Sequence, residues 1–167
     1  MNKGFTLLEI IIAISILSIG IAGSIGLVNR TIFLGFAVNK QLIAAYLAQE
    51  GMEIIHNTRH TNWIEDGVPA LSPVAWDAGI TDGDSCVNYN STSLITPCVG
   101  AARRLYIFND GIKLNYTHTP SSETTVFSRY INITHLLDGT EPYMLVKSIV
   151  EWDTGSIQAE ERLYDWK

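Results

Sequence analysis

Few side chains in this sequence have the type and spacing that catalysis or metal binding requires. His56 and His60 stand four residues apart, which would place both imidazoles on one face of a helix, a geometry that can bind a metal ion. No third ligand accompanies them in the sequence, and polar residues that end a helix are common. We therefore predict no metal site at these two histidines.

A cluster of aspartates near the middle of the chain could supply oxygen ligands. Asp77, Asp82 and Asp84 lie close to Gly83, and calcium takes about six to eight oxygen atoms. Asp-Gly clusters are more often plain turns, so calcium binding near Asp82 and Asp84 stays an open alternative. The sequence has no G-x-S-x-G motif, phosphate-binding loop or zinc-protease motif, and no evident Ser/His/Asp set. It therefore predicts neither an enzyme nor a cofactor.

The two cysteines, Cys86 and Cys98, are the remaining candidates for covalent chemistry. A nearby pair that follows a segment able to cross a membrane favours a disulfide formed in an oxidising compartment. The alternative is a pair of buried, unpaired thiols. Their spacing does not match the usual zinc patterns, which need about four clustered ligands.

One carboxylate stands within a long apolar segment. The residues from Phe5 to Val28 are apolar or small, apart from Glu9. As a helix this segment would span roughly 36 Å, enough to cross a bilayer and longer than the apolar core of a secretory signal. A carboxylate at the bilayer centre costs about 3 kcal/mol. Glu9 therefore either reaches the nearby membrane surface or has another role.

The distribution of charge predicts how the chain is oriented in a membrane and argues against nucleic-acid partners. Lys3 and the amino terminus are the only charges before the apolar segment, so the positive-inside rule places the N-terminus in the cytoplasm and the rest outside. Residues 61–167 hold seven bases and fourteen acids, a net charge of −7. An acidic surface repels phosphate backbones, so we expect no general nucleic-acid binding.

The first sixty residues have the pattern of one long helix. No proline occurs before Pro69, and we expect a helix from about Phe5 to about Arg59. Residues 5–30 form its apolar, membrane-crossing half, and residues 31–60 continue it as an amphipathic half. The apolar stripe of that second half comprises Ile32, Phe36, Ile43, Leu47 and Ile54.

The remainder of the chain predicts a head built from strands. Residues 61–104 are rich in proline and turn signals, and residues 105–167 read as antiparallel strands. Two turns, Asn109-Asp110-Gly111 and Asp153-Thr154-Gly155, predict hairpins. The strand before the second turn alternates, with Met144, Val146, Val150 and Trp152 on one face. A helix stripe and a sheet with one apolar face predict an α+β head.

The opening stretch KGFTLLEIIIAISIL resembles the N-terminal signature of type IV pilins, minor pilins and type II secretion pseudopilins. That family has a short basic leader ending in glycine, then a phenylalanine, then a glutamate four residues on within an apolar helix. Lys3, Gly4, Phe5 and Glu9 match each element. The resemblance covers about the first thirty residues, and the long helix after it looks like that of the PilV-like minor pilins.

The resemblance implies a course of processing and assembly. A prepilin peptidase would remove the leader, residues 1–4, by cutting between Gly4 and Phe5, and the new Phe5 amine would be N-methylated. The subunit would wait in the inner membrane and then join other pilin-like subunits through its N-terminal helix at an assembly platform. In such a filament Glu9 would pair with the methylated amine of a neighbour's Phe5.

The predicted function is therefore that of a structural subunit, a minor pilin of a type IV pilus at the cell surface. A pseudopilin of a type II secretion system, in a periplasmic filament, is the alternative, and a membrane-tethered binding module or enzyme is a more distant one. Two departures from the major pilins favour an accessory subunit. Major pilins often close their C-terminal region with a disulfide, whereas Cys86 and Cys98 lie mid-chain. Many pilins also carry a proline in the apolar helix, where this chain has Gly20, Gly23 and Gly26.

Overall fold

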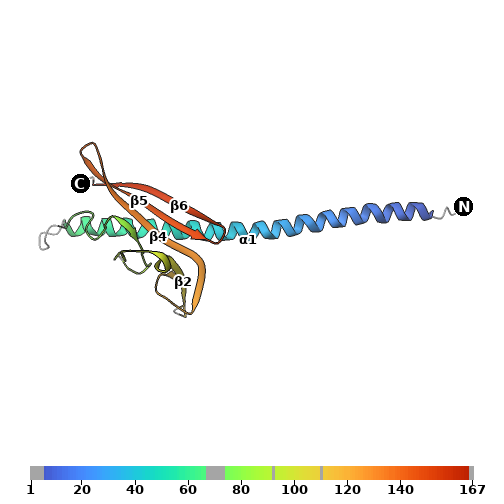
Figure 1. Cartoon of the computed structure of the whole chain (residues 1–167), viewed down its shortest axis with the longest axis horizontal. Helices are drawn as coiled ribbons and strands as arrows, with labels where there is room; N and C mark the ends of the chain where they lie inside the picture. Colours follow the sequence, from blue (N-terminus) through green and yellow to red (C-terminus); the bar gives the residue numbers. More distant parts are fainter. Residues whose placement is uncertain (1–5, 67–73, 92, 110, 166–167) are drawn as a thin grey trace. The chain divides into compact units, whose positions relative to one another are not determined.

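The computed structural model describes residues 6–66, 74–91, 93–109 and 111–165. The chain divides into two compact units, one up to Gln41 and one from Leu42 onward. Within the described residues, the first unit is helical from Leu7, and the second contains the remainder of the same helix together with the strands. The predicted α+β class is confirmed, because a long N-terminal helix precedes an antiparallel sheet (Figure 1).

Helix α1 extends from Leu7 to Asp66. Thr6 caps its start, since the Thr6 Oγ1 accepts a hydrogen bond of 3.3 Å from the backbone N–H of Glu9. The helix continues past its expected end at Arg59. Its last turns are held because the Asn62 side chain bonds to backbone carbonyls of the following loop.

Six strands form one antiparallel sheet in the order β3-β2-β4-β5-β6, with β1 paired to β4. A short 3-10 helix, Gly100–Arg103, precedes β2. The strands are β1 (Gly83–Ser85), β2 (Arg104–Asn109), β3 (Leu114–Thr117), β4 (Glu123–Asp138), β5 (Glu141–Trp152) and β6 (Gly155–Tyr164).

Both hairpins expected from the sequence are present. Asn109 pairs with Leu114 across the β2–β3 turn, and Trp152 pairs with Gly155 across the β5–β6 turn. The structure adds a third hairpin, in which Asp138 of β4 pairs with Glu141 of β5. The long β4 and β5 strands make up the centre of the sheet (Figure 1).

The core lies between the head portion of α1 and one face of this sheet. On β5 the predicted alternation is confirmed, with Met144, Val146 and Val150 fully buried and Trp152 partly buried against the cluster that contains Val150. On α1 the buried residues begin at Ala44. The expected helix stripe is correct in the head, where Leu47 and Ile54 are buried. Ile32 and Phe36, in the first unit, are exposed.

Gly51 allows the helix to approach the sheet closely. A Cβ atom added there would lie 2.6 Å from Ser148 Oγ and 2.7 Å from Ile131 Cδ1, well inside contact distance. Ala48, about one turn earlier on α1, and Ala44, about two turns earlier, are also buried. Small side chains on this face therefore set the distance between α1 and the strands.

Candidate functional site

The start of α1 holds the residues to which the sequence assigns processing and assembly. Gly4 and Phe5 lie outside the described residues. Glu9 is exposed and stands in the first turn of α1, three residues after the capping Thr6. This T-x-x-E spacing is that of a capping box, and a carboxylate in a first turn also interacts favourably with the helix dipole. The hydrogen bond present in the structure is the one from the Glu9 backbone N–H to Thr6, and it does not involve the carboxylate.

The first unit exposes an almost unbroken apolar surface. From Leu7 to Val38 the large apolar side chains of α1 are exposed, for example Leu7 at 79% and Leu27 at 70%. An 18-residue window of this helix reaches a mean hydropathy of 2.4, and α1 is long and apolar enough to cross a membrane. Such a surface needs an apolar environment, supplied by lipid or by other helices.

Hydroxyl groups in this segment are satisfied within the helix itself. Ser15, Ser18, Ser24 and Thr31 each donate to the carbonyl oxygen four residues earlier, over distances of 2.7 to 2.9 Å. In a medium without water an unsatisfied hydroxyl costs several kcal/mol. These internal bonds make the segment compatible with a bilayer or a dry filament core.

Three glycines in the apolar segment have open space around them. A Cβ atom added at Gly20, Gly23 or Gly26 would meet no atom within 4 Å. Glycine here is not required by packing within the chain. Small residues at such spacing let a neighbouring helix approach closely.

In the head, the two cysteines form a disulfide. Cys86 and Cys98 are bonded, with their Cα atoms 5.1 Å apart, and both are buried. The backbone of Cys86 also pairs with that of Ile95, and the N–H of Cys98 donates to the carbonyl of Asp84 over 2.8 Å. The bridge therefore fastens a loop to the β1 edge of the sheet.

Arg129 on β4 joins this disulfide region to the helix. Its fully buried guanidinium donates to the carbonyl of Leu47 and to the Glu50 carboxylate, both over 3.1 Å, and to the carbonyl of Val87 over 2.8 Å. Burial lowers the pKa of Arg129, and the charge of Glu50 opposes that shift. A buried charge of this kind is tolerated only when it is paired and hydrogen-bonded.

His118 is a second buried ionisable group near Arg129. Its Nδ1 donates to the carbonyl of Ala102 over 2.9 Å, since a carbonyl can only accept. The pKa of His118 is lowered to about 4. Burial is the largest cause, and repulsion from the charge of Arg129 is the second. His118 is therefore neutral near pH 7.

The aspartates considered as calcium ligands are engaged with protein partners. Asp82 accepts hydrogen bonds from the backbone and the ring of His135, and the bond from that ring is the main cause that lowers the pKa of Asp82. Asp84 accepts from Arg103 and Asn132, and Asp77 lies 3.4 Å from His135. Over the described ranges no three His, Cys, Asp or Glu side chains are grouped to hold a metal ion.

The two histidines at helical spacing contact different partners. His56 Nε2 lies 3.0 Å from a Glu161 carboxylate oxygen on β6, whereas the His60 ring stacks on Trp63 with centroids 5.6 Å apart. Their ring centroids are 6.1 Å apart in an edge-on arrangement. The structure gives them roles in helix and sheet contacts.

Sequence reasoning missed Arg129 and Gly51. Both left a signal. Arg129 stands between Phe127 and Ile131 in an alternating strand, where its parity assigns it to the buried face. Gly51 continues a series of small residues, Ala44 and Ala48, at helical spacing.

Comparison with known proteins identifies the N-terminal segment. Residues 1–25 match the family model of the prokaryotic N-terminal methylation motif. This motif is the prepilin-type signal of type IV pilins and pseudopilins. No curated protein and no solved structure matches the chain. The motif therefore supports a structural subunit of the pilin and pseudopilin class that is anchored in a membrane.

Proposed function

We propose that this chain is a minor pilin: a structural subunit that is stored in the inner membrane and assembled into a type IV pilus after its leader is removed. The observation that carries the proposal is the methylation motif at residues 1–25, which opens directly into an exposed apolar helix. The mid-chain disulfide and the glycines of the apolar helix favour an accessory subunit over a major one.

Processing would occur at the start of the chain. Water would cleave the peptide bond between Gly4 and Phe5 in the site of a prepilin peptidase, leaving residues 1–4 with a new carboxylate and Phe5 with a new amine. Methylation of that amine keeps its positive charge. The N-terminus faces the cytoplasm and the head faces outward, since Lys3 precedes the apolar segment and the head is acidic.

In the assembled filament Glu9 would accept the methylated amine of a neighbouring Phe5. A carboxylate that is buried between the packed helices of a filament, away from water, needs a counter-charge. Breaking a buried ion pair costs about 3–5 kcal/mol. A subunit placed one turn out of register would bury both charges unpaired. The pair would therefore set register as well as affinity.

Glu9→Gln tests this role with little disturbance of the helix. The cap bond at the start of α1 uses the backbone N–H of residue 9, and glutamine is accepted at this position of a capping box, so α1 should start normally while the charge is lost. We expect normal membrane insertion and normal cleavage after Gly4, together with strong under-representation of the variant in filaments from cells that also express wild-type protein. Quantitative mass spectrometry of sheared filaments measures the ratio.

Glu53→Gln is the matched control, because Glu53 is an exposed glutamate on the head portion of α1. It should enter filaments as wild-type protein does. Equal incorporation of Glu9→Gln and wild-type subunits would contradict the pairing role.

The same motif serves pseudopilins, so the location of the filament separates the two subtypes. A minor pilin should appear in filaments sheared from the cell surface. Recovery in a periplasmic filament, with none in surface pili, would assign the chain to a secretion system instead.

A further inference from the structure

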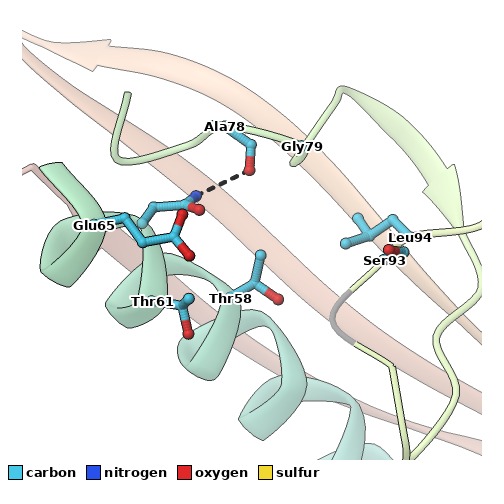
Figure 2. Close-up of a pocket in the computed structure, with 8 residues that line it drawn as sticks. Thr58, Thr61, Glu65, Ala78, Gly79, Ser93 and Leu94 are labelled. Atoms are coloured by element: carbon cyan, nitrogen blue, oxygen red, sulfur yellow. Dashed lines mark hydrogen bonds between the residues drawn. The ribbon is translucent and has the colours of Figure 1, made fainter. Parts of the chain in front are cut away.

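A hollow in the head lies between the last turns of α1 and two loop segments (Figure 2). Its volume is about 400 Å³, within the range of small-molecule sites. Figure 2 shows Glu65 on the helix opposite the Ala78–Gly79 segment, with Ser93 and Leu94 on another side of the space. The residues that decide its chemistry are Thr61, Asn62, Glu65, Ala78 and Leu94.

The side-chain donors of Asn62 and Thr61, which α1 places in this wall, are already used within the protein. The Asn62 amide nitrogen donates to the carbonyls of Trp76 and Ala78 over 3.1 and 2.9 Å, so the side chain can offer a ligand only its acceptor, Oδ1. The Thr61 hydroxyl donates to the carbonyl of Asn57 over 2.8 Å. The Glu65 carboxylate can only accept. These side chains therefore suit a ligand that brings its own N–H donors.

The electrostatics of the hollow favour a positive ligand. Glu65 lies in the last turn of α1, and that turn contains no basic residue. The C-terminal end of a helix carries partial negative charge from its aligned peptide dipoles, so an acid there is unfavourable and a cation is favourable. Residues 61–167, which include Glu65, carry a net charge of −7.

The hollow also has an apolar side. Leu94 is partly buried and packs against the main hydrophobic cluster of the head. A hydrated metal ion would gain nothing from this surface, and calcium sites use about six to eight oxygen ligands, usually with several carboxylates. A charged N–H donor on a short hydrocarbon stem would contact both Glu65 and Leu94.

We infer that this hollow binds a primary alkylammonium or alkylguanidinium group, with Glu65 as its counter-charge and Leu94 against its stem. This chemistry is that of a lysine or arginine side chain on another protein, or of a free small amine. The inference does not rest on the pilin assignment, because its residues all lie in the head, outside the methylation motif.

A nuclear magnetic resonance titration of the full-length chain in maltoside micelles tests the inference. The probe is n-butylammonium chloride, and the reporters are the backbone amides of Gly79, Ser93 and Leu94 and the side-chain amide of Asn62. We expect saturable shifts confined to these signals. Sodium chloride and tetramethylammonium chloride, which has the charge but no N–H donor, should not reproduce them at equal ionic strength.

Two variants sharpen the result. Glu65→Gln removes an acid from the negative end of a helix, so it should fold normally and weaken binding at least about tenfold. Glu53→Gln, an exposed glutamate elsewhere on α1, should bind as wild type does. Shifts that tetramethylammonium reproduces, shifts that persist equally in Glu65→Gln, or no saturable shift at all would overturn the inference.

Comparing n-butylammonium with a lysine derivative distinguishes the two sources of the cation, a free amine and a protein side chain. Nα-acetyl-lysine methylamide carries the same ammonium on a peptide backbone. Binding about tenfold tighter than n-butylammonium would identify a protein side chain as the occupant. Equal binding would identify a free amine.

Discussion

Two buried basic side chains, Arg129 and His118, occupy the region where helix, sheet and disulfide loop meet. Arg129 keeps its charge through Glu50 and two backbone carbonyls. His118 stays neutral because burial and the nearby guanidinium both disfavour its protonation. At this place in the head, pairing therefore keeps Arg129 charged, and burial keeps the neighbouring His118 neutral.

This arrangement predicts a loss of stability in mild acid. The pKa of His118 falls from 6.5 in the unfolded chain to about 4 in the folded head. Between these values the unfolded state binds more protons, so stability falls as the pH decreases from about 6.5 to about 4. The loss through this residue amounts to about 3 kcal/mol at most. Chemical denaturation of the full-length chain across this pH range measures it.

His118→Gln provides the control, because an amide can still donate to the Ala102 carbonyl but does not titrate. The variant should lose most of the pH dependence above pH 4. The Asp82 pKa is also lowered, but its contribution is lost only as the pH falls below the usual range of a carboxyl group. An equal pH slope in wild type and His118→Gln would contradict the assignment.

At the scale of elements, the contact between α1 and the β4–β5 face determines the stability of the head. Gly51→Ala should destabilise it by about 1–3 kcal/mol, although alanine is the better helix former by about 1 kcal/mol. The added methyl group would meet Ser148 and Ile131 at less than 3 Å. Thermal unfolding followed by near-ultraviolet circular dichroism measures the change.

The same substitution elsewhere on the helix separates packing from propensity. Gly35→Ala adds a methyl group where no atom lies within 4 Å, so it should leave the melting temperature of the head unchanged. Combining Gly51→Ala with Ile131→Val and Ser148→Ala should restore part of the loss. A head that is stabilised by Gly51→Ala alone would refute the close contact.

The disulfide supports a separate element, the loop between Cys86 and Cys98. Closing a loop of this length stabilises the fold by about 3 kcal/mol in the chain-entropy model. Cys86→Ser should lower the melting temperature of the head under oxidising conditions, and a reductant should have little further effect on that variant. Alkylation of both cysteines in untreated, folded protein would show that the bridge is absent in solution.

Elements with strong local signals could be predicted from the sequence, and contacts between elements could not. The apolar helix, both hairpins and the buried face of β5 follow from periodicity and turn residues. The end of α1 at Asp66 depends on Asn62 bonding to a loop fourteen residues away, which no local pattern encodes. The contacts of Arg129 likewise join residues about eighty positions apart.

In the candidate sites, too, local features could be predicted from the sequence and contacts between distant residues could not. The motif around Glu9 is local and was evident from residue order alone. The hollow beside Glu65 depends on where the Ala78–Gly79 segment and Leu94 come to lie, and these belong to loops without a periodic pattern. That Asn62 and Thr61 offer only acceptors to this hollow follows from their hydrogen bonds within the fold.

At the scale of the whole molecule, the two units differ in how their apolar side chains are kept from water. The head contains all the buried residues of α1, from Ala44 onward, and closes its own core. Among residues 6–41, the described part of the first unit, no large apolar side chain is buried within the chain. The first unit of such a protein needs a lipid bilayer or neighbouring helices around it. The proposed storage in a membrane followed by assembly into a filament would supply each in turn.

The residue at which the mature chain begins distinguishes a processed filament subunit from a membrane protein that keeps its leader. Intact mass and the N-terminal peptide should be measured on chain purified from membranes and from filaments of the same cells, with Gly4→Val as the blocked control. We predict that the wild-type chain begins at Phe5 with one methyl group on its amine, and that the variant stays at full length and outside filaments. A filament-borne wild-type chain that still begins at Met1, or a Gly4→Val chain that loses residues 1–4 normally, would contradict the account.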